Sequence, residues 1–315
     1  MKDAKIYIAG HQGMVGSAVL DVFRDNDYSN IITRSSSELD LRNQEETAHF
    51  IEREQPDAII LAAARVGGIL ANDQYPYQFL YDNLAIQNNV INAAHNNEVE
   101  QLIFLGSSCI YPRQAPQPLR ENYLLTGPLE PTNQWYAVAK IAGIKLCEAL
   151  RKQYGRTYTA LMPTNLYGPR DNYDLETSHV VPAMIRKFHE AKEAGHAPVT
   201  LWGTGAPMRE FLYVRDLAEA VYFAFENQLG ESMYNIGTGR DLSIRRLAGL
   251  IQQIIGHRGD IIWDETKPDG TPRKLLDVAR IHSRGWRHKT DLESGLAKTY
   301  RWFLENSKNL KEVEL

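Results

Sequence analysis

Residues 6–16 read IYIAGHQGMVG, and this stretch decides the fold. The apolar run before Gly10 predicts a short buried strand, and apolar residues at helical spacing follow Gly16. In such a turn the first glycine permits tight bending. The second lets backbone approach a pyrophosphate, and the third lets helix pack on strand. Because the free N–H groups of a helix N-terminus favour anions, the stretch predicts a dinucleotide site. The alternative is a tight turn without a ligand.

Apolar strands alternate with amphipathic helices beyond this turn. The predicted strands are residues 30–33, 58–63, 101–105, 158–162 and 199–202. The predicted helices are residues 45–54, 81–96, 135–154, 179–193, 216–226 and 244–255. This alternation predicts an α/β fold, a doubly wound parallel (Rossmann) sheet with a smaller C-terminal substrate lobe. We assign residues 1–164 to the nucleotide-binding domain and residues 165–315 mainly to the substrate lobe. A segment at about residues 213–237 is expected to return to the first domain.

The composition is that of an ordinary globular enzyme. The 315 residues are 43% hydrophobic and 23% charged, with a formal net charge of -4. This charge gives no reason to expect nucleic acid or an anionic membrane as partner. No apolar run reaches the roughly 20 residues that span a bilayer, and the first residues do not resemble a signal peptide. The two cysteines, Cys109 and Cys147, do not form a disulfide framework, so we expect a cytoplasmic protein without a metal site.

The end of the second predicted strand indicates which dinucleotide binds. An Asp or Glu normally stands there in NAD-binding proteins and holds the ribose 2′-hydroxyl. Here the strand runs into Arg34, and serines follow at positions 35, 36 and 37. A guanidinium and hydroxyl groups suit a 2′-phosphate, so NADP(H) is the expected cofactor. An ordinary surface arginine at a strand end is the alternative.

Tyr136 and Lys140 are four residues apart on one predicted helix and therefore share a face. A nearby ammonium is expected to lower the pKa of the tyrosine, which could then exchange a proton with a carbonyl or hydroxyl near neutral pH. The lysine can also hold the nicotinamide ribose. Ser107 follows the strand at residues 101–105, and ligands bind beyond the carboxyl ends of parallel strands. We therefore expect Ser107 to donate a hydrogen bond to the same substrate oxygen.

Together with the segment REFLYVRD at residues 209–216, these motifs resemble the extended short-chain dehydrogenase/reductase family. More narrowly, the chain resembles the bifunctional 3,5-epimerase-4-reductases that convert GDP-4-keto-6-deoxy-D-mannose to GDP-L-fucose with NADPH. The resemblance is nearly full length. It also rests on AAARVGGI at residues 62–69, GSSCIYP at 106–112, PTNLYGP at 163–169, PMREF at 207–211 and KPDGTPRKLLDV at 267–278.

The resemblance implies that Cys109 and His179 are the acid/base pair of epimerisation, with Cys109 as base and His179 as acid. A C4 ketone acidifies the protons at C3 and C5, and both side chains are expected to titrate near enough to neutrality to move them. Ser107 and Tyr136 are then placed to stabilise the enolate oxygen. Taken alone, Cys109 would be a packed small hydrophobe and His179 a surface or capping residue. Cys147 is expected in the core.

The resemblance also implies two sets of binding residues. The expected cofactor residues are Gly10, His11, Gln12, Gly13, Met14, Val15, Gly16, Arg34, Asp40, Leu41, Leu105, Gly106, Ser107, Ser108, Tyr136, Lys140, Pro163, Thr164, Asn165, Leu166 and His179. The expected contacts to the GDP-sugar are Lys187, Trp202, Arg209 and Asp269. Taken alone, the lysine would be a solvated helix charge, the tryptophan a core aromatic and the aspartate a turn residue.

Gln12 departs from the family, which often carries an arginine there, so more of the 2′-phosphate binding falls to Arg34.

A homodimer through helices that include residues 135–154 is the expected assembly. Two other functions remain open. One is an enzyme of the same fold that acts on another sugar nucleotide, such as a 4-epimerase. The other is a non-catalytic dinucleotide sensor, against which the combination of Ser107, Tyr136 and Lys140 argues.

Overall fold

The computed structural model describes residues 2–175, 177–267 and 269–307. Its main element is a six-stranded parallel sheet with the strand order β2-β1-β3-β4-β5-β9. The strands are β1 (Ile6–Ala9), β2 (Ile31–Ile32), β3 (Ala58–Leu61), β4 (Gln101–Leu105), β5 (Thr157–Pro163) and β9 (Met233–Ile236). The order reverses direction at β1, which is the doubly wound arrangement, so the predicted fold class is confirmed.

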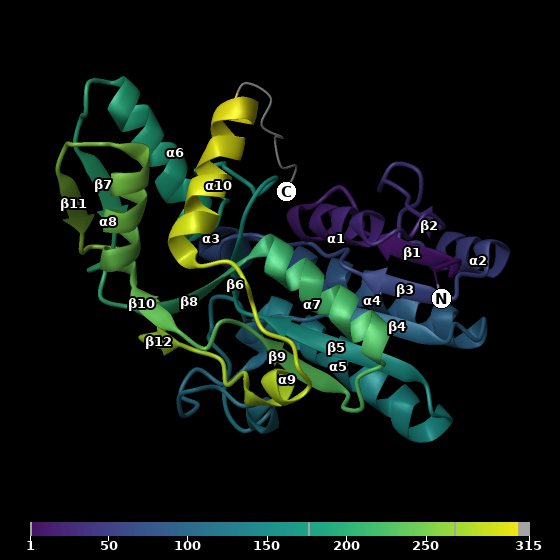
Figure 1. Cartoon of the computed structure of the whole chain (residues 1–315). Helices are drawn as coiled ribbons and strands as arrows, with labels where there is room; N and C mark the ends of the chain where they lie inside the picture. The colour runs from purple at the N-terminus through teal and green to yellow at the C-terminus, as the bar shows by residue number, and fades with distance from the viewer. Residues whose placement is uncertain (1, 176, 268, 308–315) are drawn as a thin grey trace.

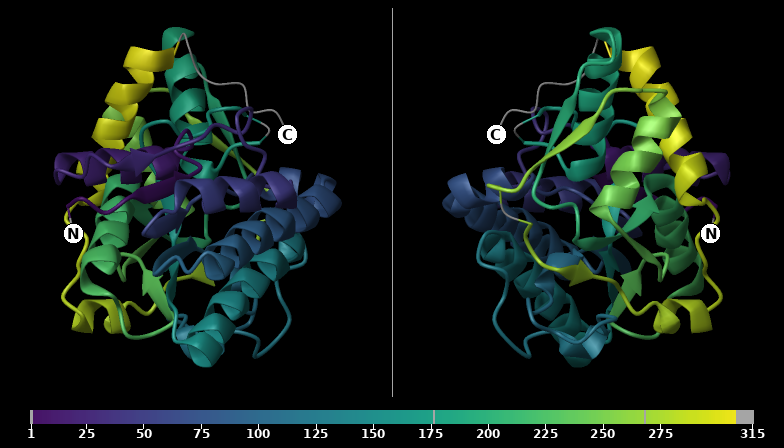
Figure 2. Two further views of the ribbon diagram at one scale, coloured as in Figure 1. Left: turned by 90° about the vertical axis from the view of Figure 1, so that its right-hand side faces the viewer. Right: turned by 90° about the vertical axis from the view of Figure 1, so that its left-hand side faces the viewer.

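Helices cover both faces of this sheet (Figures 1 and 2). On one face α1 (Met14–Asp25) packs against α7 (Val214–Asn227). On the other face α4 (Pro76–Asn96) packs against both α2 (Gln44–Glu54) and α5 (Gln134–Tyr154). Strands covered on both faces are mostly apolar, and every residue of β1, β3, β4 and β9 is buried.

The second lobe has its own small sheets and its own core. In one sheet β8 (Met208–Tyr213) is paired with β6, β10 and β12, and in another β7 is paired with β11. These partners are β6 (Asn165–Tyr167), β7 (Val199–Trp202), β10 (Asp241–Ser243), β11 (Ile261–Asp264) and β12 (Arg273–Lys274). Helices α6 (Val180–Glu193), α8 (Ile244–Ile255) and α10 (Leu292–Asn306) enclose the core beside them, and Figure 1 shows them grouped away from the main sheet.

The chain passes between the lobes more than once. It leaves the main sheet after β5 and forms β6 and α6 in the second lobe. It then returns through α7 to β9, which pairs with β5 at the edge of the main sheet. The remaining short elements are α3 (Ile69–Gln74), α9 (Ala279–Ser283) and the 3-10 turns Ser108–Ile110 and Glu121–Tyr123. Within the described residues no helix is long and apolar enough to cross a membrane.

Several elements differ from those predicted. The helix expected at residues 81–96 begins at Pro76, because a proline lacks the N–H that the first helical position leaves unpaired anyway. The strand expected at residues 30–33 is reduced to Ile31–Ile32 at the sheet edge. The sequence does not predict the helices α3, α9 and α10 or the strands β6, β8, β9, β10, β11 and β12. Most of these strands have two to four residues, too few to show a hydrophobic period.

Gly143 allows α5 to lie close to β4 and α4. A Cβ on this residue would stand 2.6 Å from Cζ of Phe104 and 2.9 Å from Cδ of Gln87. Both neighbours are held in place, since Phe104 is fully buried and Gln87 donates a hydrogen bond to the Ala139 carbonyl.

Gly143→Ala should therefore lower the free energy of unfolding by about 1–3 kcal/mol through overpacking. Gly249→Ala is the matched control, because this glycine is also inside a helix and nothing lies within 4 Å of the added methyl group. The control should raise stability by about 0.5–1 kcal/mol. Urea denaturation of both variants tests the pair, and equal changes would contradict the packing argument.

Candidate active site

The glycine turn after β1 has the geometry of a phosphate site. Gly10 has φ +86°, and a Cβ there would lie 2.7 Å from the Ala63 amide nitrogen. A Cβ on Gly16 would lie 2.1 Å from the Gly10 carbonyl oxygen, so the helix can approach the strand only with glycine here. Gly13 has no side chain to cover the amides that open α1, and the first helical turn carries no acidic residue. These residues therefore fit the pyrophosphate of a dinucleotide.

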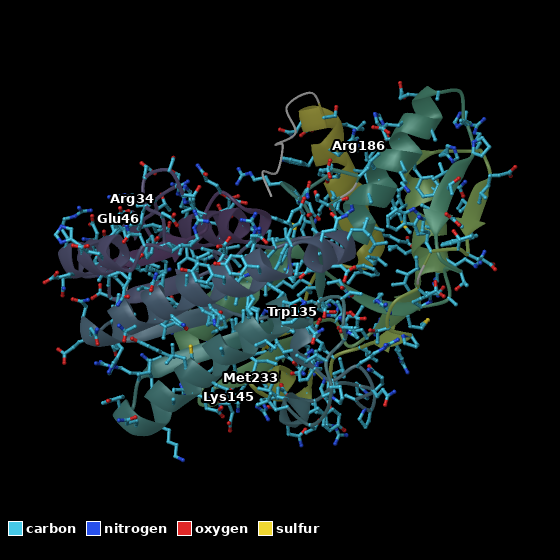
Figure 3. The ribbon with its side chains drawn as sticks, turned by 180° about the vertical axis from the view of Figure 1, so that it is seen from behind. Arg34, Glu46, Trp135, Lys145, Arg186 and Met233 are labelled. Atoms are coloured by element: carbon cyan, nitrogen blue, oxygen red, sulfur yellow. The ribbon has the colours of Figure 1, made fainter. Side chains whose placement is uncertain are left out.

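The predicted 2′-phosphate residues already have partners within the protein. An Nη atom of Arg34 lies 3.3 Å from Oε1 of Glu54, and its other Nη atom donates to the Thr33 carbonyl at 2.7 Å. The amide and hydroxyl of Ser35 both donate to Glu38 at 2.7 Å. Figure 3 shows Arg34 on the outer part of the nucleotide-binding lobe. Arg34 and the serine hydroxyls can therefore reach a 2′-phosphate only by sharing or exchanging these partners.

The next predicted cofactor residues lie near Arg42. Both carboxylate oxygens of Asp40 accept hydrogen bonds from the Arg42 guanidinium, which holds the pKa of Asp40 below its usual value. Leu41 is buried in the core. The other predicted residues lie at or just beyond the carboxyl ends of β1, β4 and β5, strands of one parallel sheet: His11, Gln12, Met14, Val15, Leu105, Gly106, Ser108, Pro163, Thr164, Asn165 and Leu166.

Ser107, Tyr136 and Lys140 meet where β4 ends against α5. Ser107 precedes a 3-10 turn, and its Oγ accepts a hydrogen bond from the Cys109 amide at 3.3 Å. The Lys140 ammonium is buried, donates to the Leu105 carbonyl at 2.8 Å and lies 5.7 Å from the centre of the Tyr136 ring. Because Leu105 is the last residue of β4, this bond fixes the lysine at the edge of the sheet where ligands are expected.

The expected effect of Lys140 on Tyr136 is wrong for this structure. Burial raises the pKa of Tyr136 well above its usual value, and the neighbouring Cys109 raises it further. Burial also lowers the pKa of Lys140 to about 8, since an ammonium loses its hydration there. Removal from water therefore outweighs the attraction between ammonium and phenolate, and the tyrosine is held as a neutral proton donor.

The surrounding protein shifts the pKa values of both Cys109 and His179. Burial raises the pKa of the Cys109 thiol, while Lys274, the Ser107 hydroxyl and Lys140 oppose that rise. His179 is the N-cap residue of α6, makes no side-chain cap hydrogen bond and is exposed at its surface. The surrounding protein and the charge of Lys274 lower the pKa of this imidazole. Both shifts are toward the uncharged form of the group, the thiol for Cys109 and the imidazole for His179.

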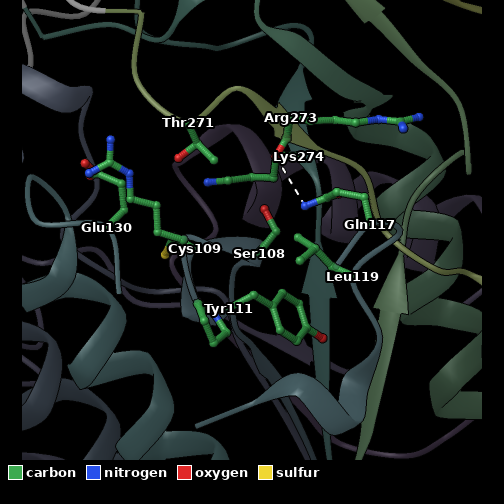
Figure 4. A pocket seen from close by; sticks show the side chains of 11 residues that line it. Ser108, Cys109, Tyr111, Gln117, Leu119, Glu130, Thr271, Arg273 and Lys274 are labelled. Carbon is green, nitrogen blue, oxygen red and sulfur yellow. Dashed lines mark hydrogen bonds between the residues drawn. The ribbon is translucent and has the colours of Figure 1, made fainter. Parts of the chain in front are cut away.

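A small pocket lies directly above Cys109. Its empty space is about 280 Å³, part of it open to solvent. Figure 4 shows Cys109, Ser108 and Lys274 on its walls, with Glu130 and Thr271 at one side. Lys274 belongs to the motif at residues 267–278, but the sequence does not indicate it as a site residue, because a two-residue strand has no periodic pattern.

The predicted sugar-nucleotide residues divide into two groups. In the first, Trp202 is 47% exposed, and two ammonium groups lie near its ring. Lys187 is 5.8 Å from the ring centre, and Lys267, which was not predicted, is 5.5 Å from it. Lys187 also donates to the Thr200 carbonyl at 3.1 Å. An exposed aromatic face with flanking cations suits a planar ring next to phosphate groups.

The second group consists of Arg209 and Asp269. Burial lowers the pKa of Arg209, and the nearby charge of Asp269 opposes this effect. The Asp269 carboxylate accepts hydrogen bonds from the amide and hydroxyl of Thr204, at 2.8 and 2.7 Å. Asp269 therefore connects two loops of the substrate lobe, and each of its carboxylate oxygens accepts a hydrogen bond from Thr204.

Glu210 was missed as a site residue although it follows Arg209 in the motif. The side chain is fully buried, and its carboxylate accepts hydrogen bonds from the amides of Thr238, Gly239 and Leu276. Its own carbonyl accepts from the Asn165 side chain at 2.8 Å. This residue joins the cofactor edge of the main sheet to the substrate lobe.

Comparison with known proteins gives consistent results. Residues 6–237 match the NAD dependent epimerase/dehydratase family. The chain is 54% identical to the GDP-L-fucose synthase of Sinorhizobium fredii over 302 residues, which covers 96% of each chain. It is 50% identical to the GDP-L-fucose synthase of Escherichia coli over 97% of this chain and 98% of the relative. A structural neighbour is the GDP-mannoheptose C4 reductase MlghC of Campylobacter jejuni with NADP bound, with a TM-score of 0.89 and 36% identity over 96% and 99% of the two chains.

The lowered pKa of Lys140 makes a prediction about stability. Between about pH 8 and the usual lysine pKa of about 10.4, the unfolded chain binds a proton at this residue that the folded chain does not. Stability should rise with pH in that window, because the unfolded state holds more protons.

Relative to Lys140→Met, the wild-type protein should gain about 2 kcal/mol in free energy of unfolding from about pH 8 to about pH 10. Urea denaturation of both proteins across this range measures the difference, and the variant cancels contributions from the buried tyrosines. If the difference in free energy of unfolding between the two proteins stays constant with pH, the pKa of Lys140 is not lowered in the folded protein.

Proposed function

Because this chain belongs to the NAD dependent epimerase/dehydratase family, we propose that it converts GDP-4-keto-6-deoxy-D-mannose to GDP-L-fucose. The protein is an NADPH-dependent oxidoreductase with epimerase activity. The observation that carries the proposal is the placement of a thiol, Cys109, two residues beyond Ser107 in the same site as Tyr136 and Lys140. A simple reductase needs the hydroxyl groups and the lysine but has no use for a second proton-transferring pair.

The epimerisation uses the acidity of carbons next to a ketone. As the thiolate, Cys109 removes the proton at C3, and the imidazolium of His179 donates a proton to the opposite face of that carbon. The thiol then loses its proton to solvent and the imidazole regains one, and the same two steps follow at C5. Each removal leaves an enolate whose negative charge lies on O4. Ser107 and Tyr136 can donate hydrogen bonds to that oxygen, and such donors are worth several kcal/mol where water is excluded.

The reduction takes place at C4 of the epimerised sugar. NADP(H) supplies hydride chemistry when it is bound on the glycine turn. Tyr136 donates a proton to O4, a role that suits its raised pKa because a neutral phenol keeps its proton until the alkoxide develops. Lys140, held by the Leu105 carbonyl, is placed to orient the ribose next to the nicotinamide.

A second candidate reaction is the C4 reduction of another GDP-linked keto sugar. Its support is the 36% identity with MlghC, named as a GDP-mannoheptose C4 reductase. Solvent isotope exchange distinguishes the two, because reduction alone leaves C3 and C5 untouched. A non-catalytic sensor would bind NADPH and consume none with any keto sugar.

We further propose that the protein is a cytoplasmic homodimer. Both cysteines are free thiols, as suits a reducing compartment. Apolar side chains stand exposed on the outer faces of the adjacent helices α4 and α5, and Figure 3 labels Trp135 among them. On α4, Tyr77 and Tyr81 stack at 5.4 Å and are 66% and 54% exposed. A second copy that presents the same two helices would bury this surface.

The main experiment follows NADPH consumption with GDP-4-keto-6-deoxy-D-mannose in deuterated water, with NADH in parallel. Cys109→Ser should abolish deuterium uptake at C3 and C5. Tyr136→Phe should retain measurable uptake at a lower rate, because Ser107 still donates to O4. It should slow NADPH consumption by roughly 10²–10⁴-fold, because it removes the proton donor to O4. Deuterium uptake at the wild-type rate in Cys109→Ser would overturn the role of Cys109 as the base. An unchanged rate of NADPH consumption in Tyr136→Phe would overturn the role of Tyr136 as the proton donor to O4.

The dimer is tested at Val138, which is 44% exposed on α5. Val138→Glu should convert the protein to a monomer, because a carboxylate in an apolar interface lacks a partner. Ile262→Glu is the control, since Ile262 is 50% exposed on β11 in the other lobe. Light scattering after size exclusion measures both, and a wild-type monomer or a dimeric Val138 variant would disprove the proposed interface.

A further inference from the structure

Lys274 is held firmly although its strand has only two residues. It pairs in register with Arg209 of β8. The next residue, Leu275, accepts a hydrogen bond at 2.7 Å from the Leu119 amide and donates one to the Gln117 side chain at 3.0 Å. The Leu276 amide then donates to the buried Glu210 carboxylate at 2.9 Å. The backbone on both sides of the Lys274 side chain is therefore fixed.

The Lys274 side chain points into the pocket above Cys109, as Figure 4 shows. The neighbouring Arg273 lines the same pocket but points away from the thiol. Its guanidinium forms an ion pair with Asp241 at 2.6 Å. Of these two adjacent cations, only Lys274 thus acts on the thiol, and Arg273 provides a matched comparison.

Charged and titratable groups reach Lys274 and Cys109 from every element packed around the pocket. Around Lys274 they are Cys109, Arg209, Glu130 and His179, and around Cys109 they are Ser107, Tyr136, Lys140 and Lys274. Arg113 and Arg273 also line the pocket. Burial lowers the pKa of Lys274, and Arg209 lowers it further, while Cys109 and Glu130 raise it. Lys274 is first among the groups that oppose the rise in the pKa of the thiol.

We infer that Lys274 supplies the positive charge that stabilises the thiolate of Cys109 when this residue takes a proton from the sugar. This inference rests on the proposed epimerisation. A cation beside a thiol favours the anionic sulfur, which is the form that accepts protons. The same charge lowers the pKa of His179, which makes its imidazolium a stronger proton donor to the enolate carbon. Lys274 acts through Cys109 and is therefore a positioning residue.

The competing role for Lys274 is to bind the diphosphate of the substrate. A lysine that only binds phosphate would change KM and leave the titration of the thiol in the substrate-free protein unaltered. A lysine that stabilises the thiolate would shift that titration without any substrate. The thiolate absorbs in the ultraviolet, so the titration can be read as the difference between each protein and its Cys109→Ser counterpart, independently of reagent access and of Cys147.

Lys274→Met should raise the midpoint of the Cys109 titration by about one pH unit or more. The rate of deuterium uptake at pH 7 should then fall about tenfold and recover as the pH rises. Lys274→Arg should keep the wild-type midpoint, and Arg273→Met should also leave it unchanged. If the methionine variant does not fold, Lys274→Gln replaces it, with circular dichroism as the check on folding.

Two failures can be told apart. If the wild-type protein takes up no deuterium at C3 and C5, the proposed epimerisation is wrong, whatever the thiol titration shows. If the wild-type protein takes up deuterium and the thiol of Lys274→Met titrates as in wild type, the role of Lys274 is wrong and the epimerase stands. If Arg273→Met shifts the midpoint of the Cys109 titration by the same amount, the role of Lys274 is also wrong, because a general loss of positive charge would then explain the shift.

Discussion

The active site depends on one buried negative charge, the carboxylate of Glu210. Taking a carboxylate out of water is costly unless its oxygens are satisfied. Here backbone amides from two separate stretches satisfy them, one after β9 and one after β12. Burial raises the pKa of Glu210, and these N–H donors counteract the rise. The two stretches are therefore fixed relative to β8, because any displacement would leave the carboxylate without donors.

The hydrogen bonds to Glu210 fix both the cofactor side and the substrate side of the site. The carbonyl of Glu210 accepts hydrogen bonds from Thr164 and Asn165 at the end of β5, on the cofactor side. Its neighbour Arg209 faces the substrate lobe and pairs in register with Lys274. A shift between the lobes would therefore disturb the cofactor edge, the arginine and the lysine together. The hydrogen bonds to Glu210 thus set the geometry of the active site as well as connecting the cores of the two lobes.

The sequence predicts those parts of the site that depend on local geometry. The glycine turn and the pairing of Tyr136 with Lys140 follow from spacing within a few residues, and both have the expected placement. Spacing says nothing about burial, so the direction of the Tyr136 pKa was wrong. Spacing also says nothing about hydrogen-bond partners within the protein, so the bonds between Asp269 and Thr204 could not be predicted. Lys274 could not be found because its strand exists only through pairing with distant β8.

The raised pKa of Tyr136 bears on the direction of the reaction. A tyrosine that must remove a proton from an alcohol benefits from a lowered pKa, since the phenolate is then available at neutral pH. A tyrosine that must protonate a developing alkoxide benefits from staying neutral, and burial ensures this here. The same dry surroundings would suppress the thiolate of Cys109, so a proton acceptor in this site needs a cation close to it. Burial thus suits the reductive step directly, and the epimerising step requires a compensating charge in the same cavity.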